Sequence, residues 1–128
     1  MTGPRVLIVD DEDSILFAMK DYLDRDGFRV DAARGANEAR LLLCNRSYEA
    51  VVSDLNLDAR HPAQGLVLLE HVRSAQPLAR TLLLTACGSP EMERRARALG
   101  VDAVLDKSEE LQAISGILGA LTREAGRR

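Results

Sequence analysis

Short aliphatic runs alternate with amphipathic stretches along the whole sequence, and this alternation constrains the fold more than any other feature. The runs are rich in Val, Leu and Ile, as strands buried on both faces are, and the stretches between them repeat apolar residues at helical spacing. Strands that alternate with helices are joined by crossovers, which produce a parallel sheet covered by helices on both faces. We therefore predict a doubly wound α/β domain with a five-stranded parallel sheet and five helices.

The boundaries of these elements follow from the same pattern. Apolar and polar residues alternate in the second predicted strand, as is typical of an edge strand or a half-exposed strand. Gly27 and Gly100 can end helices, Ser89 and Pro90 can begin one, and Asp13 is expected to cap another. One domain is expected over residues 1–122, followed by a loose tail at 123–128. The predicted strands are Arg5–Asp10, Phe28–Ala33, Ala50–Asp54, Arg80–Ala86 and Asp102–Lys107, and the predicted helices lie within 11–27, 36–44, 65–75, 89–100 and 108–121.

Composition excludes several classes of function. The net charge of −3 gives no electrostatic reason to expect direct nucleic acid binding. No apolar run approaches the roughly 20 residues that span a membrane, and the first residues do not form a signal peptide. Cys44 and Cys87 have no metal-binding spacing, so we expect two reduced thiols in a cytoplasmic protein.

Polar residues gather at the carboxyl ends of four predicted strands. Asp10 and Asp11 end the first strand, Asp54 ends the third, Thr85 lies at the end of the fourth, and Lys107 ends the fifth. In open parallel sheets, ligands bind beyond the carboxyl ends of the strands, near the point where the strand order reverses. These five residues therefore predict one site.

The residue types indicate the chemistry of this site. Three neighbouring carboxylates repel one another unless a cation neutralises them, and a set of oxygen ligands without His or Cys favours Mg²⁺. A lysine and a hydroxyl supply further donors for a phosphoryl group. Asp54 is then expected to be a nucleophile that accepts a phosphoryl group, with Mg²⁺ and Lys107 offsetting the negative charge.

The segments "LIVDDE", "VVSDLNL", "LLLTA" and "VLDKS", in this order over one domain length, resemble the receiver domain of two-component response regulators, the CheY-like family. The resemblance covers about the whole chain and implies a flavodoxin-like (β/α)5 fold. It implies Asp54 as the phosphoacceptor, Asp11 as a direct Mg²⁺ ligand and Asp10 as a ligand acting mostly through water. Asn56 is expected to offer its backbone carbonyl to the metal.

The resemblance also implies the remaining roles and the partners. Thr85 is expected to be the switch hydroxyl and Lys107 the lysine that contacts the phosphate. The phosphoryl donor is expected to be the phosphohistidine of a sensor histidine kinase or a phosphotransfer protein. A downstream partner or an output domain is expected on the face made by Ser89–Leu99, Val104 and Ser108–Leu121, and homodimer formation is left open.

Enzyme classes with similar motifs do not fit the sequence, and we do not expect an enzyme. A P-loop NTPase needs a Gly-rich loop that ends in Lys-Ser or Lys-Thr, which this sequence lacks. Haloacid-dehalogenase-type phosphatases carry a second Asp two residues after the nucleophile, which serves as the general acid. Here that residue is Asn56, which has no carboxyl proton to donate, so an acyl phosphate on Asp54 is expected to persist as a signal.

Three departures from the family pattern leave an alternative open. Ser108 replaces the usual Pro after the lysine, and Val104 replaces the Tyr or Phe that usually takes part in the switch. The loop from Asp54 to Gly65 is about three residues longer than usual, a change that surface loops tolerate. The alternative is a receiver-like module that works through protein contacts without phosphorylation.

Overall fold

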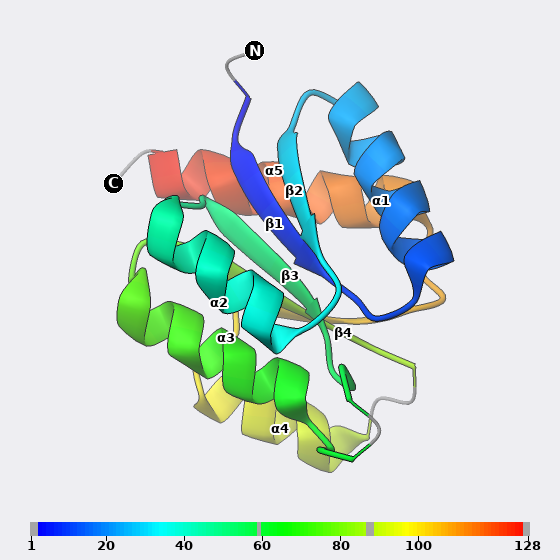
Figure 1. Ribbon diagram of the computed structural model, residues 1–128, viewed down its shortest axis with the longest axis vertical. Coiled ribbons are helices and arrows are strands. Elements are labelled where there is room, and N and C mark those ends of the chain that lie inside the picture. Colours follow the sequence, from blue (N-terminus) through cyan, green and yellow to red (C-terminus); the bar gives the residue numbers. More distant parts are fainter. Residues whose placement is uncertain (1–2, 59, 87–88, 127–128) are drawn as a thin grey trace.

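The computed structural model describes residues 3–58, 60–86 and 89–126 of the 128-residue chain. Within these residues the chain forms five strands and five helices in strict alternation, as the sequence predicts (Figure 1). No helix in this described part is long and apolar enough to cross a membrane. In chain order the elements are β1 (Arg5–Val9), α1 (Asp13–Arg25), β2 (Arg29–Ala33), α2 (Ala36–Asn45), β3 (Ala50–Asp54), α3 (Gln64–Ala75), β4 (Arg80–Thr85), α4 (Pro90–Ala98), β5 (Ala103–Asp106) and α5 (Leu111–Gly126).

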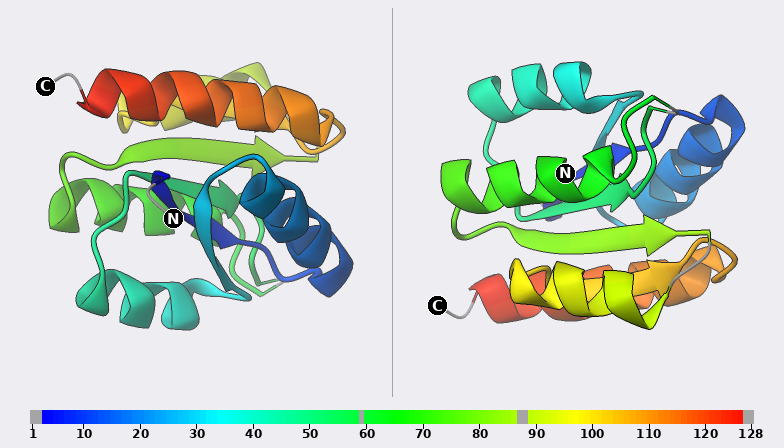
Figure 2. Two further views of the ribbon diagram at one scale, coloured as in Figure 1. Left: turned by 90° about the horizontal axis from the view of Figure 1, so that it is seen from above. Right: turned by 90° about the horizontal axis from the view of Figure 1, so that it is seen from below.

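The strands form one parallel sheet in the order β2-β1-β3-β4-β5, which confirms the doubly wound fold and the edge position of the second strand. Helices α1 and α5 pack on one face and α2, α3 and α4 on the other (Figure 1). In both views of Figure 2, α4 (yellow) and α5 (orange to red) lie beyond β4. The strand order reverses between β1 and β3, and ligands bind at such a reversal in this topology.

Aliphatic side chains hold both layers of helices to the sheet. On one face Leu16, Met19 and Leu23 of α1 share a core with Ile114 and Leu118 of α5. On the other face apolar side chains of α2, α3 and α4 pack on β1, β3 and β4. Burial of each large aliphatic side chain contributes about 1.5–3 kcal/mol, so these central strands are held firmly on both sides.

The sheet register aligns the carboxyl ends of the strands. Val9 pairs with Ser53, so the residues that follow them at the ends of β1 and β3 are neighbours. Asp54 pairs with Leu84, and Thr85 of β4 follows directly. These pairings bring three strand ends together at one edge of the sheet.

Helix ends agree with the sequence signals in most places. Gly27 and Gly100 have positive φ angles of 99° and 88° directly after α1 and α4, a conformation that glycine adopts at low cost. The Ser89 hydroxyl oxygen accepts a hydrogen bond from the Met92 N–H (3.1 Å), as an N-cap does. The predicted cap at Asp13 is wrong, because Glu12 occupies the N-cap position and makes no side-chain cap.

The last helix differs from its prediction at both ends. It begins at Leu111, because the backbone after β5 first turns back on Asp106, whose side chain and carbonyl accept the N–H groups of Ser108 and Glu109. It continues to Gly126, past the start of the loose tail predicted at residue 123. Thr122 lies inside the helix and donates its hydroxyl hydrogen to the Leu118 carbonyl (2.8 Å). Residues 127–128 lie outside the described residues.

Gln76, at the C-terminal end of α3, connects three segments through its side chain. Its carbonyl oxygen accepts a hydrogen bond from the Tyr48 N–H (2.8 Å), which precedes β3. Its amide group donates to the carbonyls of Leu43 (3.0 Å) and Arg46 (2.8 Å) at the end of α2. One side chain thus ties α2 and α3 to the start of β3.

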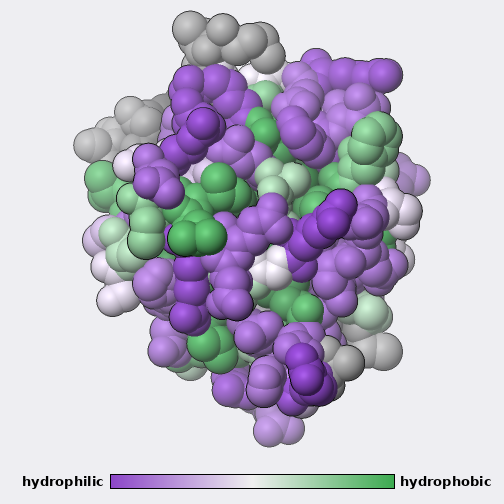
Figure 3. Space-filling model, in the orientation of Figure 1, coloured by the Kyte–Doolittle hydropathy of each residue, from purple (hydrophilic) through white to green (hydrophobic). Residues whose placement is uncertain are grey.

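The outer surface over α2 and α3 is mostly polar, with separate apolar patches among charged side chains (Figure 3). Leu41 of α2 is 67% exposed and Val67 of α3 is 48% exposed. Isolated exposed apolar residues of this kind are normal for a globular protein. Cys44 is an exposed free thiol, while Cys87 lies outside the described residues.

Candidate functional site

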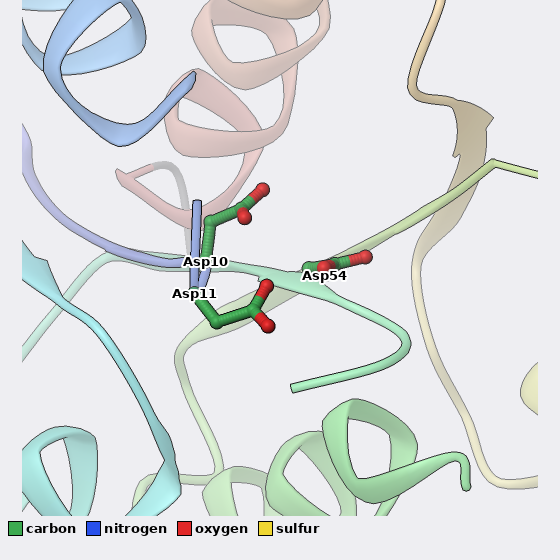
Figure 4. Close-up of side chains that lie close together, drawn as sticks. All are labelled: Asp10, Asp11 and Asp54. Atoms are coloured by element: carbon green, nitrogen blue, oxygen red, sulfur yellow. The ribbon is translucent and has the colours of Figure 1, made fainter. Parts of the chain in front are cut away.

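Two buried carboxylates lie where the strand order reverses. Asp10 directly follows β1 and Asp54 is the last residue of β3, and their exposed fractions are only 2% and 5%. The Asp11 side chain is exposed and belongs to the same cluster (Figure 4). One carboxylate oxygen of each residue lies within 4.8 Å of the other two. The structure therefore brings together the three carboxylates that the sequence places at these strand ends.

The Lys107 ammonium group contacts both buried carboxylates. Its Nζ lies 3.1 Å from Oδ2 of Asp10 and 3.3 Å from Oδ2 of Asp54. Its backbone N–H donates to the Thr85 carbonyl (2.9 Å), which fixes the start of the side chain beside the end of β4. One lysine therefore balances two buried carboxylates, and the site has a net negative charge.

The pKa values of Asp54 and Lys107 are both shifted in this site, where one ammonium group faces two buried carboxylates. Burial, and next the charge of Asp10, raises the pKa of the Asp54 carboxyl, while Lys107 and a backbone hydrogen bond from Asn56 oppose the shift. Burial alone lowers the pKa of Lys107, but its interactions with the carboxylates of Asp10 and Asp54 outweigh burial and raise this pKa. Lys107 therefore stays charged at neutral pH, and ionised Asp54 would gain from a further cation nearby.

The donor set fits a magnesium ion. All three clustered side chains offer carboxylate oxygens, which a hard cation such as Mg²⁺ prefers. Oδ2 of Asp10 is buried and, although Lys107 lies 3.1 Å away, accepts no hydrogen bond from the described residues. A hydrated cation would supply the hydrogen bond that this oxygen lacks.

Thr85 occupies the position that the sequence predicts for it. It is the last residue of β4 and is 3% exposed. Its backbone carbonyl accepts the hydrogen bond from the Lys107 N–H, which joins the end of β4 to the residue after β5. The hydroxyl thus lies on β4, the strand next to β3 and Asp54.

Asn56 lies in the exposed loop after β3. Its backbone hydrogen-bonds the Asp54 carboxyl group, and its side-chain oxygen accepts a hydrogen bond from the Ala63 N–H (3.3 Å). Its side chain therefore closes the loop, and the metal-binding role of its backbone carbonyl stays a prediction.

Two further residues near the site were not assigned a role from the sequence. Glu12 places Oε1 at 3.5 Å from Nζ of Lys107, and its backbone N–H donates to Oδ1 of Asp10 (2.9 Å). A Cβ on Gly65 would lie 1.8 Å from the carbonyl oxygen of Asp54, so only glycine allows the start of α3 to approach Asp54 this closely. Two sequence features could have pointed to these residues: Glu12 is the third acidic residue in succession after β1, and Gly65 is a lone glycine at the start of a predicted helix.

Comparison with known proteins agrees with this geometry. The model of the response regulator receiver domain matches residues 6–118. PetR of Rhodobacter capsulatus is 33% identical over 122 residues, which cover 94% of this chain and 49% of PetR. A probable chemotaxis protein CheY of Rhizobium etli is 29% identical, with 91% of this chain and 94% of that protein covered. This chain spans 49%, 60% and 54% of its relatives PetR, RegA and VanRB, which are longer proteins.

Solved structures show the same fold. A CheY-like receiver domain from Methanospirillum hungatei superposes with a TM-score of 0.90 at 25% identity, covering 98% of both chains. A response regulator from Burkholderia pseudomallei, solved with a phosphorylated aspartic acid, a calcium ion and citrate, has a TM-score of 0.83 at 27% identity and covers 97% of this chain and 71% of that one. The chain therefore belongs to the response regulator receiver domain family of two-component signalling, as its motifs suggest.

Proposed function

We propose that this domain accepts a phosphoryl group on Asp54 from the phosphohistidine of a sensor histidine kinase or a phosphotransfer protein. An Asp54 carboxylate oxygen attacks the phosphorus, the P–N bond breaks, and its electron pair returns to the imidazole of the donor. The observation that carries the proposal is the contact of Lys107 with Asp54 (3.3 Å) beside the Asp10 carboxylate. Lys107 would contact a phosphoryl oxygen as negative charge develops there.

Asp11, Asp54 and the backbone carbonyl of Asn56 would hold Mg²⁺, with Asp10 acting mostly through water. When bound, Mg²⁺ supplies positive charge to the acceptor carboxylate and to a phosphoryl oxygen. The buried, hydrogen-bond-deficient oxygen of Asp10 and the net negative charge of the cluster support this assignment. The related Burkholderia pseudomallei structure, with its phosphorylated aspartic acid and calcium ion, also supports it.

The domain would act as a switch rather than as an enzyme that turns over. Asn56, two residues after the acceptor, offers an amide where a phosphatase of the haloacid dehalogenase type carries an acid, so the acyl phosphate would persist. The Thr85 hydroxyl would then turn to a phosphoryl oxygen and shift the loop toward Pro90. Residues 87–88 of this loop lie outside the described residues.

The signal would pass to a downstream partner or output domain on the face formed by α4, β5 and α5. Val104 of β5 is only partly buried and packs against the core, so a change at the end of β4 can reach this face through a short path. A phosphoryl group on Asp54 can change the conformation of this face only if the resting and the activated conformations differ little in free energy.

Phosphorylation tests the proposal directly. The protein is incubated with acetyl phosphate and Mg²⁺, and its intact mass is measured. We expect one labile phosphoryl adduct, lost in Asp54→Asn and retained in Asp58→Asn, a nearby loop carboxylate that serves as the matched control. Lys107→Ala should keep the fold and reduce the adduct. No adduct with Mg²⁺ present, or one on another residue, would favour the module that works without phosphorylation.

Amide exchange with and without beryllofluoride, a stable phosphoryl mimic, tests the path of the signal. We expect the protection of the amide hydrogens to change at Ala86, at Ser89 and in α4. Changes confined to the Asp54–Gly65 loop would contradict the proposed output face.

A further inference from the structure

A cavity of about 260 Å³ lies between α4 and β5 at the output face. Thr85 forms one wall, and Met92 of α4 and Val104 of β5 form apolar parts of the lining. Because Thr85 also lies at the end of β4 beside Lys107, the cavity and the acceptor site share a residue. The shape of the cavity therefore depends on where the Thr85 side chain lies.

The residue at position 104 lines the cavity and has a short side chain. Val104 ends at its γ carbons and is partly buried against the core. The longer Tyr or Phe that the receiver family usually carries here would extend into the neighbouring space. This chain thus has no large side chain of its own at position 104 to move between a buried and an exposed state.

The described residues that line the cavity carry negative charge only. Glu93 and Asp106 both contribute, and no Lys or Arg is among the lining residues. Glu93 is paired with Arg97 of the same helix (Oε1–Nη2 2.9 Å), an exposed pair that contributes little and that another cation can replace. Hydrogen bonding from Ser108 lowers the pKa of Asp106, so that carboxylate stays ionised at neutral pH.

We propose that this cavity receives a basic side chain, Arg or Lys, of the downstream protein partner. The aliphatic part of that side chain would pack against Met92 and Val104, and its charged tip would lie near Glu93 and Asp106. The inference rests on the proposed function, in which phosphorylation draws Thr85 toward Asp54. That movement would enlarge the cavity and strengthen binding, and the partner would in turn favour the phosphorylated state.

Short peptides test the inference. The capped pentapeptide Ala-Ala-Arg-Ala-Ala is titrated into ¹⁵N-labelled protein with and without beryllofluoride and Mg²⁺, alongside peptides with norleucine or phenylalanine at the centre. We expect shifts centred on Met92, Val104 and Asp106, and tighter binding of the Arg peptide than of either comparator. Beryllofluoride should tighten that binding about fivefold or more, the range of ordinary coupling between sites.

Matched variants separate charge from shape. Val104→Phe should fill the cavity and abolish binding, whereas Val67→Phe on the exposed side of α3 should leave binding unchanged. Glu93→Gln should weaken binding of the Arg peptide, and Arg97→Ala should strengthen it by removing the competing cation. Thermal melting of each variant shows whether it is folded, so lost binding can be assigned to the cavity.

Several results would overturn the inference. One is tighter binding of the phenylalanine peptide than of the Arg peptide, and another is an affinity for the Arg peptide that Glu93→Gln does not change. The others are equal affinity for the Arg peptide with and without beryllofluoride, and the absence of saturable chemical-shift changes at millimolar peptide. Intact mass after acetyl phosphate treatment reports on Asp54 separately. A missing adduct would contradict the proposed function, while peptide binding to the unmodified protein would still decide whether the cavity takes a basic side chain.

Discussion

Replacing Asp54 by Asn should stabilise the metal-free protein at neutral pH. Lys107 attracts the ionised carboxylate by about 5 kcal/mol at 3.3 Å, taking an effective dielectric of roughly 20. Repulsion by Asp10 at up to 4.8 Å cancels about 3.5 kcal/mol of this. Burial costs an ion several kcal/mol more. With a burial cost of about 3 kcal/mol, the balance is unfavourable by about 1.5 kcal/mol, and the raised pKa of Asp54 has the same sign.

The sign of the pH dependence follows from that raised pKa. Below the ordinary pKa of an aspartate, Asp54 is protonated in both the folded and the unfolded chain, so Asp54→Asn should change stability little. As the pH rises through the raised pKa of the folded state, the parent protein loses stability and the Asn variant does not. The difference between the two should therefore grow from acid toward neutral pH and then level off.

Urea unfolding of both proteins between pH 4 and pH 8, in EDTA, measures this difference. We expect the free energy of unfolding of Asp54→Asn to exceed that of the parent by about 1–2 kcal/mol near pH 7. Mg²⁺ at ten times its Kd should add about 1.4 kcal/mol to the parent and much less to the variant. Asp21→Asn, an exposed carboxylate of α1, should change stability by less than about 0.5 kcal/mol. A less stable Asp54→Asn protein at pH 7, or a difference that does not vary with pH, would refute the reasoning.

Three further substitutions test other parts of the site and its support. Asp11→Ala should abolish the rise in melting temperature that MgCl₂ gives the parent, and an unchanged rise would exclude Asp11 as a ligand. Gln76→Ala should lower the free energy of unfolding by about 2–4 kcal/mol, because it removes three hydrogen bonds, whereas exposed Gln112→Ala should be nearly neutral. Gly65→Ala should cost about 1–3 kcal/mol and slow phosphorylation by acetyl phosphate, because the added methyl group strikes the carbonyl at the end of β3. Gly116→Ala, with open space around it in α5, is the control, and an equal effect of both changes would contradict the steric explanation.

The sheet could be predicted because a strand that is buried on both faces has apolar residues in succession, and such runs are easy to recognise in the sequence. The runs that became β1, β3 and β4 each contain three or four consecutive aliphatic residues, and so short an aliphatic run between two predicted helices favours a strand buried on both faces. No comparable sequence pattern marks the C-terminal end of α5. Thr122 and the residues after it suit either a helix or a tail, and the hydroxyl bond to Leu118 that fits Thr122 into the helix forms only in the folded chain.

The site residues at the strand ends could be predicted together with the sheet, because parallel strands bring their carboxyl ends to one edge of the sheet. Asp10, Asp54 and Lys107 needed only the strand assignments to be placed together. Glu12 and Gly65 could not be placed in this way. Their contacts depend on the paths of the loops after β1 and β3, which sequence periodicity does not determine.

The close approach of α3 to β3 has a consequence for protein engineering. The Gly65 N–H donates to the Leu55 carbonyl (2.8 Å), so both ends of the loop between them are fastened next to Asp54. Leu57 is buried at the start of this loop, whereas the described residues Asp58, Arg60, His61 and Pro62 are not, so these four are the ones that can be exchanged. Because lengthening a closed loop costs little free energy, a ligand-binding peptide grafted there would sit beside the acceptor without displacing it. Ligand binding to such a graft could then be read out as a change in the rate at which the domain takes up phosphate.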